Sequence, residues 1–142
     1  MGKIKSKLGL GPMSSEIIEA VFKNSQENKN QLMLIASKNQ IDYGGGYVNN
    51  WTTKEYSQFL SSMKEKYPKS DVKTCRDHCG PGFNKNFSLG DSYKTMEEDI
   101  KQGFDLIHID FCKFKGDLEE KLKESKKAIE FCSKLNPNIL FE

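Results

Sequence analysis

Residues with the chemistry of an active site are concentrated in one five-residue stretch that begins at Cys75. The stretch holds two thiols, a guanidinium, a carboxylate (Asp77) and an imidazole (His78), and a Gly-Pro-Gly sequence follows it. The run that leads into it, residues 72–75, is short and strand-like. Enzymes of the α/β class present catalytic side chains where a strand ends and a loop leads to a helix. We therefore predict that Asp77 and His78 lie at the mouth of an incomplete (β/α) barrel.

A second imidazole and a second carboxylate stand in a later run, Asp105 to Asp110. Strand alternation places Leu106, His108 and Asp110 on one face and leaves two isoleucines on the other. Polar residues toward the end of one face are typical of a barrel interior that opens into a site. The alternative is a hydrogen-bonded core histidine with an aspartate that caps a helix.

The run Leu32 to Ala36 is apolar at every position, which is typical of a parallel strand covered on both faces. It continues directly into a polar cluster, residues 37–42, which includes Asn39 and Gln40. Three glycines follow, and we interpret them as a flexible loop over the barrel mouth because no nucleotide-binding pattern surrounds them. Polar residues at the ends of successive strands together predict one catalytic edge of a sheet.

Arg76 is the one arginine among 22 basic residues, and it stands beside the Asp-His pair. A planar guanidinium can bind a carboxylate or a phosphate through two hydrogen bonds, so Arg76 is a candidate substrate contact; a chance position is the alternative. The four cysteines include no CxxC pair. Because a structural zinc site usually takes two such ligand pairs, reduced and partly buried thiols are the expectation.

Apolar residues at helical spacing follow Ser14, Thr52 and Asp117, and they recur between residues 93 and 104. Thr52 and Glu55 have the spacing of a capping box. The element order is a helix and then β-α-β-α-β-α-β. It predicts an α/β fold, the N-terminal half of a partial TIM (β/α)8 barrel with four parallel strands. A flavodoxin-like sheet is the competing architecture, but it leaves the two polar clusters without a shared purpose.

Composition and charge exclude several classes of protein. The 142 residues are sufficient for one domain. The net charge of +2 comes from 22 basic and 20 acidic residues that are interspersed, so no nucleic-acid partner is expected. No run approaches the ~18 apolar residues of a membrane helix, so no membrane partner is expected either. The apolar segment near the N-terminus is too short for a signal peptide, and we expect a cytoplasmic protein.

Three blocks of the chain carry a family pattern. They are Ile35–Gln40 with the Gly-Gly-Tyr at 45–47, Asp77–Pro81 and Gly103–Asp110. In order and spacing these blocks resemble the tagatose-bisphosphate aldolase Z-type subunit family, and the resemblance spans about residues 30–142. It implies a TIM-barrel fold related to the class II, zinc-dependent aldolases. Members of this family are described as non-catalytic partners that support a catalytic aldolase subunit.

The resemblance also implies roles for individual residues. His78 matches the first metal-binding histidine of class II aldolases, and Asp77 matches the acid that carries a proton to and from the substrate hydroxyl. Asp110 would line the metal pocket at the end of the third strand. The implied cofactor is Zn²⁺, and its ligand set within this chain is incomplete. We expect these residues to contact substrate: Asn39, Gln40, Arg76, His108 and Asp110.

We divide the chain into residues 1–30, a basic segment with the leading helix, and residues 31–142, the first half of a barrel truncated at its fourth strand. A complete barrel takes about 250 residues, so we expect an incomplete chain without aldolase activity in isolation. Its open sheet edges would favour homo-oligomers. The predicted function is a class II aldolase-type lyase of carbohydrate metabolism or its supporting subunit, with a sugar-phosphate substrate and a catalytic aldolase subunit as partners. The alternative is a non-enzymatic sugar-phosphate-binding or assembly module without metal.

Overall fold

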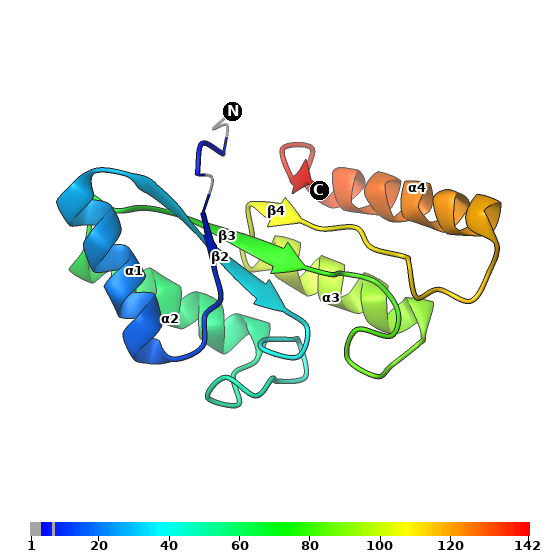
Figure 1. Ribbon diagram of the computed structural model, residues 1–142, viewed down its shortest axis with the longest axis horizontal. Helices are drawn as coiled ribbons and strands as arrows, with labels where there is room; N and C mark the ends of the chain where they lie inside the picture. The colour runs from blue at the N-terminus through cyan, green and yellow to red at the C-terminus, as the bar shows by residue number, and fades with distance from the viewer. Residues whose placement is uncertain (1–3, 7) are drawn as a thin grey trace.

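The computed structural model of the protein describes residues 4–6 and 8–142, and in these ranges β-strands and α-helices alternate (Figure 1). The strands are β1 (Gly9–Leu10), β2 (Gln31–Ser37), β3 (Asp71–Asp77), β4 (Leu106–Ile107) and β5 (Leu140–Phe141). The helices are α1 (Ser15–Asn28), α2 (Thr53–Lys66), α3 (Leu89–Lys101) and α4 (Leu118–Leu135). All neighbouring strands are parallel, and their order in the sheet, β1-β2-β3-β4-β5, is their order along the chain.

The sheet has one strand more than the sequence predicts. The four predicted strands are β2 to β5, and β1 precedes them at the edge of the sheet. Its two residues have no apolar periodicity of their own, and they form a strand because Gly9 and Leu10 pair in parallel with Met33 and Leu34. The leading helix α1 therefore connects two adjacent strands of the sheet.

The two faces of the sheet differ in burial. In β2, Leu32, Leu34 and Ala36 are buried, whereas the residues between them, Met33 and Ile35, are half-buried. The prediction that this strand is covered on both faces is therefore wrong. Residues of opposite parity point to opposite faces, and among the described residues the packed core lies on the face of Leu32, Leu34 and Ala36. That core joins the sheet to the helices through these fully buried side chains: Ile18, Leu34, Tyr56, Met96 and Ile107.

Side-chain caps determine where three of the helices begin. The Ser14 hydroxyl accepts a hydrogen bond from the amide of Ile17 at the start of α1. Thr52 and Glu55 form the predicted capping box of α2, and Asp117 and Glu120 form a second one at α4. Each capping box satisfies two backbone amides that the first helical turn leaves without partners. The helix starts hold the loops before them in position, and two of these loops border the site described below.

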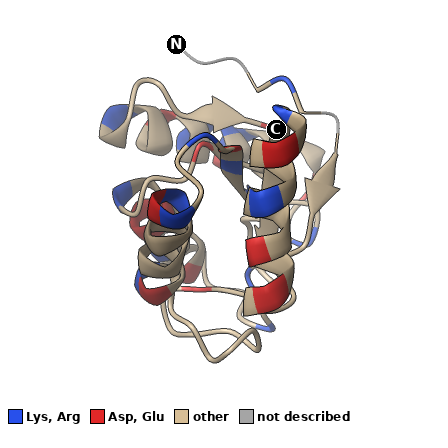
Figure 2. Cartoon of the chain, turned by 90° about the vertical axis from the view of Figure 1, so that its left-hand side faces the viewer, with Lys and Arg blue, Asp and Glu red and all other residues tan. Residues whose placement is uncertain are grey.

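Charged residues lie along the outer surfaces of the helices. Figure 2 shows acidic and basic residues interspersed on these segments, without a long stretch of one sign. This distribution agrees with the sequence, in which acidic and basic residues are nearly balanced. Among the helices described, none has both the length and the apolar composition needed to cross a membrane.

Candidate functional site

Four polar residues lie side by side at the C-terminal ends of the strands. Ser37 pairs with Asp77 in the register of β2 and β3. Arg76 of β3 pairs with Ile107 of β4, so the residues that follow them, Asp77 and His108, lie beside each other. Ile107 pairs in turn with Phe141 of β5, so Glu142 lies beside His108. Because residues level with one another in a parallel sheet share a face, this row lies on the face that the core leaves open.

Two carboxylates and two imidazoles converge around Asp77 and His108 of this row: Asp77, Asp110, His78 and His108. Asp110 Oδ2 lies 2.7 Å from His78 Nδ1, and Asp77 Oδ1 lies 3.3 Å from His78 Nε2. Asp77 Oδ1 is also 3.4 Å from Nδ1 of His108, and the two imidazole rings are 4.6 Å apart. The structure therefore brings together the four residues that the sequence placed at strand ends in two separate blocks.

The backbone reaches this geometry through a tight approach after β3. His78 has a φ of 75°, in the left-handed region that a non-glycine residue seldom adopts. The amide of Cys79 then donates to the carbonyl of His108, at 2.8 Å. Gly80 packs so closely on the segment after β4 that a Cβ there would lie 1.6 Å from the carbonyl oxygen of Asp110. The Gly-Pro-Gly sequence thus permits the loop to lie directly against residues 108–110.

Asp110 fixes the orientation of His78. Partial burial would raise the pKa of Asp110, but hydrogen bonds from the Cys112 amide and from His78 outweigh it and hold the pKa below its ordinary value. An ionised carboxylate only accepts hydrogen bonds. The Nδ1 of His78 therefore carries a hydrogen and donates a hydrogen bond to Asp110. The other ring nitrogen, Nε2, faces Asp77 Oδ1 at 3.3 Å.

Three residues of the cluster lie close enough together that they could hold a divalent metal ion. Ligand atoms of Asp77, His78 and His108 all lie within 4.8 Å of one another. A tetrahedral zinc ion with bonds of about 2.0–2.1 Å separates two ligand atoms by about 3.4 Å. The two separations from Asp77 Oδ1, 3.3 and 3.4 Å, match that value and are long for hydrogen bonds. A carboxylate that holds the far nitrogen of a ligating histidine, as Asp110 holds His78, is a usual accompaniment of such sites.

Asn39 and Gln40 use their side chains within the protein. The Asn39 amide donates to the carbonyl oxygen of Phe83, at 2.8 Å. Gln40 accepts from the amide of Ser37, at 2.9 Å, and its nitrogen lies 3.1 Å from the sulfur of Met13. Asn39 therefore holds the loop beside the cluster, and Gln40 closes the turn at the end of β2.

The structure does not bring Arg76 to the cluster. Consecutive strand residues point to opposite faces of the sheet. Because Asp77 lies on the open face, Arg76 lies on the face that packs against the helices. Its guanidinium is fully buried, pairs with Asp99 at 2.6 and 2.7 Å, and donates to the carbonyls of Ala36 and Ile41. The one arginine joins the strand ends to α3 from within the core.

The cysteines are free, as expected, and three of the four are buried. Burial raises the pKa of Cys75 to about 12 and that of Cys79 well above its ordinary value. At neutral pH both groups are thiols, and only a thiolate ligates zinc. The imidazoles and carboxylates of the open face are therefore the better ligands for a metal in this region.

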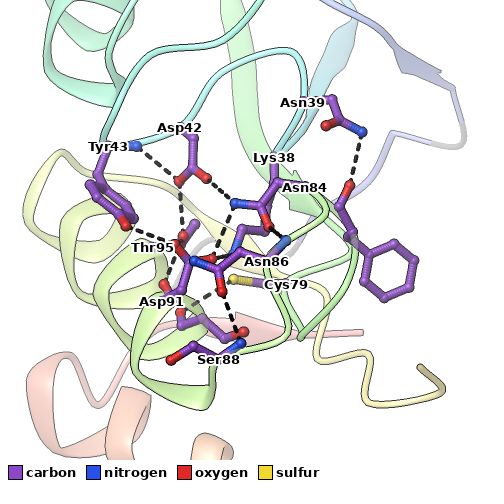
Figure 3. A network of polar contacts seen from close by, with 12 residues as sticks. Lys38, Asn39, Asp42, Tyr43, Cys79, Asn84, Asn86, Ser88, Asp91 and Thr95 are labelled. Carbon is purple, nitrogen blue, oxygen red and sulfur yellow. Dashed lines mark hydrogen bonds and ion pairs between the residues drawn. The ribbon is translucent and has the colours of Figure 1, made fainter. Parts of the chain in front are cut away.

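A buried polar network that the sequence reasoning missed lies beside the cluster (Figure 3). Asp91, near the start of α3, accepts from Lys38 Nζ at 2.6 Å and from the Tyr43 hydroxyl at 2.7 Å. Asn84 donates to both Asp91 and Asp42, at 3.1 and 3.2 Å. The network ties the loop after β2 to the loop after β3. Lys38 stands in the predicted polar cluster, but its burial depends on a partner 53 positions later.

The hydrogen bonds of this network shift the pKa values of its members. The bond to Asp91 raises the pKa of Tyr43 to about 12, with burial as a further cause. Burial would raise the pKa of Asp91, but bonds from Lys38, Tyr43 and Asn84 outweigh it and lower the pKa. Asp91 is therefore an ionised acceptor, and both of its oxygens hold side chains from the neighbouring loops.

A cleft of about 220 Å³ lies at the other end of the sheet, near the start of β3 and β4. Ser57, Lys64, Lys73 and Asp105 are among its lining residues. None of the four clustered residues lines it. The convergence of ionisable groups, rather than this cleft, identifies the candidate site.

Two comparisons with known proteins bear on this arrangement. Residues 10–135 match a family model described as D-tagatose-1,6-bisphosphate aldolase subunit GatZ/KbaZ-like. The fold is similar to the crystal structure of a probable tagatose 6 phosphate kinase from Sinorhizobium meliloti 1021, with a TM-score of 0.76 and 16% sequence identity. The alignment covers 94% of this chain and 37% of that one, so this chain spans little more than a third of the length of the solved structure. At this identity the second comparison supports the fold, and it confirms the predicted partial-barrel architecture.

Proposed function

Because the chain belongs to the GatZ/KbaZ-like family of D-tagatose-1,6-bisphosphate aldolase subunits, we propose that it supports the aldolase reaction as an accessory subunit that carries a divalent-metal site. The match spans residues 10–135, which includes every residue of the cluster. The observation that supports the metal site most directly is the convergence of Asp77, His78 and His108. We further propose that the protein acts in the cytoplasm. There it would bind a catalytic aldolase subunit, and the two subunits together would bind a ketose bisphosphate.

The residues of the cluster would have two roles in such a site, as ligands of the ion and as a partner that orients one ligand. His78 Nε2, His108 Nδ1 and Asp77 Oδ1 would hold the ion, and Asp110 keeps His78 in the required tautomer. A bound Zn²⁺ supplies Lewis-acid polarisation of a substrate carbonyl or hydroxyl oxygen. The Asp77 side chain is about one-third exposed, at 35%, so it can also meet a substrate hydroxyl and accept its proton.

Metal content tests this proposal. Protein loaded with zinc and then dialysed should retain one equivalent, and His78→Ala and Asp77→Asn should both lose it. Asp71→Asn is the matched control, since Asp71 is an exposed carboxylate at the opposite end of the same strand. Wild-type protein that retains no zinc, or variants of Asp77 and His78 that retain as much as wild type, would contradict the metal site.

The accessory role has a separate test. Retro-aldol cleavage of tagatose 1,6-bisphosphate by a catalytic class II subunit should rise when the wild-type chain is added, and the rise should be smaller with His78→Ala. An unchanged rate with wild-type protein would contradict the accessory role, whatever the metal content.

A metal-free sugar-phosphate-binding module is the second candidate, and one observation favours it. Lys113, from the loop after β4, places its Nζ 4.1 Å from the centre of the Phe83 ring, and that ring stacks on His78. A cation at the rim of the cluster can attract a phosphate group without a metal. Calorimetric binding of tagatose 1,6-bisphosphate in the presence of a chelator, weakened in Lys113→Gln, would support this candidate over the first.

A further inference from the structure

One face of the His78 imidazole is covered by an aromatic ring from the following loop. The Phe83 ring stacks on it with centroids 4.6 Å apart and planes inclined by 11°. The His78 side chain is otherwise 39% exposed, and its backbone has the left-handed φ of 75°. Asp110, Asp77 and His108 are the other neighbours of this imidazole, and the stacked Phe83 ring adds a contact that covers one of its faces.

Hydrogen bonds hold the backbone of Phe83 and the residue that follows it in place. Its carbonyl oxygen accepts the hydrogen bond from Asn39, at 2.8 Å. The next residue, Asn84, donates to Asp91 and Asp42 in the buried network (Figure 3). The Lys38 ammonium forms an ion pair with Asp91, and the two side chains are 0% and 6% exposed. A buried ion pair with two further hydrogen bonds is a rigid support, because a change in any member leaves a buried polar group without a partner.

We propose that Phe83 is a positioning residue, which holds the His78 imidazole so that Nδ1 meets Asp110 while Nε2 faces Asp77 and His108. The Asn39 and Asn84 contacts hold Phe83 in place and so connect the buried network to the site. This also explains Asn39, which stands in the predicted substrate cluster but turns its amide to the Phe83 carbonyl. The support that Phe83 gives to His78 rests on the stacking geometry, beside the bond to Asp110, and only its effect on metal binding rests on the proposed function.

The histidine signals of the protein in solution test this directly, because the chain has two histidines, His78 and His108. In chelator-treated wild-type protein, the ring current of Phe83 should displace the His78 carbon-bound proton signals upfield, and long-range nitrogen–proton correlations should show the Nδ1–H tautomer. Phe83→Leu should move these signals toward their unstructured values. Phe83→Tyr, which keeps the ring, should preserve them.

Phe87→Leu is the matched control. Phe87 lies in the same loop and is 54% exposed, and its ring contacts Gly82 rather than His78. Zinc titration provides a second readout: Phe83→Leu should bind about 3- to 10-fold more weakly, the factor that corresponds to one lost aromatic contact. Phe83→Tyr and Phe87→Leu should bind as wild type does.

The outcomes separate the two proposals. His78 signals that are the same in Phe83→Leu as in wild type would overturn the positioning role. If Phe83→Leu fails to fold by circular dichroism, Asn39→Asp replaces it, since it removes the donor to Phe83 and keeps the side-chain size; unchanged His78 signals in it would also overturn the role. Ring-dependent His78 signals in a protein that binds no zinc would uphold the positioning of His78 and refute the proposed metal site.

Discussion

Replacement of Arg76 by leucine tests how the strand ends are supported from inside the core. Both members of the Arg76–Asp99 pair are fully buried, and two hydrogen bonds of 2.6 and 2.7 Å join them. In Arg76→Leu the Asp99 carboxylate would keep its burial and lose its counter-ion. Removal of one partner of such a pair costs about 3–5 kcal/mol, because an uncompensated charge remains in the interior. The carbonyl groups of Ala36 and Ile41 would lose a donor as well.

The loss should depend on pH in a defined direction. Burial raises the pKa of Asp99 above its ordinary value, and Arg76 opposes that effect. Without the guanidinium, the pKa of Asp99 in the folded protein should rise further above its unfolded value. A carboxyl group whose pKa is raised by folding binds a proton more tightly in the folded state than in the unfolded state. The folded protein therefore gains stability as the pH falls through the folded pKa of that group. The deficit of Arg76→Leu should therefore shrink as the pH is lowered from neutral toward the ordinary carboxyl pKa of about 4.

Urea unfolding followed by circular dichroism measures both effects. Lys66→Met is the control, since it breaks the exposed pair with Glu19, whose members are 54% and 39% exposed. An exposed pair of this kind is worth about 0–1 kcal/mol. The double variant Arg76→Leu/Asp99→Leu should recover part of the lost stability, because it removes the buried charge. A single Arg76→Leu variant that loses less than about 1 kcal/mol, as the control does, would refute the reasoning.

Two further changes test the local geometry. Gly80→Ala should disrupt the packing of its loop on the segment after β4, because the new Cβ would meet the Asp110 carbonyl oxygen at 1.6 Å, and thermal unfolding should show a large loss of stability. Gly44→Ala is the control, with no atom within 4 Å of the added carbon, and should leave the melting temperature almost unchanged. Asp117→Ala removes one side of the α4 capping box and should cost about 1 kcal/mol in urea unfolding, whereas Glu119→Ala, which leaves the box intact, should cost less.

Local sequence patterns predicted the parallel α/β architecture and most of the cluster. Apolar runs of strand length alternate with helical periods, and polar residues stand where the runs end. Parallel strands that follow one another in a sheet bring their C-terminal ends to the same edge. Asp77, His78, His108 and Asp110 can therefore be grouped from the sequence alone. The separation between the two blocks, 32 residues from His78 to Asp110, is bridged by that rule alone.

Other features depend on contacts that no local pattern encodes. The two-residue strand β1 exists because β2 supplies its hydrogen-bond partners. Met33 and Ile35 are as apolar as their buried neighbours, and they are half-buried because they lie on the face of β2 opposite the core. Lys38 and Phe83 carry no signal of their importance, since the burial of the first and the stacking of the second arise from pairing across two loops.

By itself, the amino-acid sequence determined which residues are chemically able to act and at which strand ends they stand, because periodicity and chain order act locally. The tertiary structure alone decided which of these side chains meet. Arg76 and Asp77 are neighbours in the chain, yet one lies inside the core against Asp99 and the other on the open face beside two imidazoles. The pleat of a β-strand sends consecutive residues to opposite faces, and packing on only one of those faces makes the difference between a support and a site.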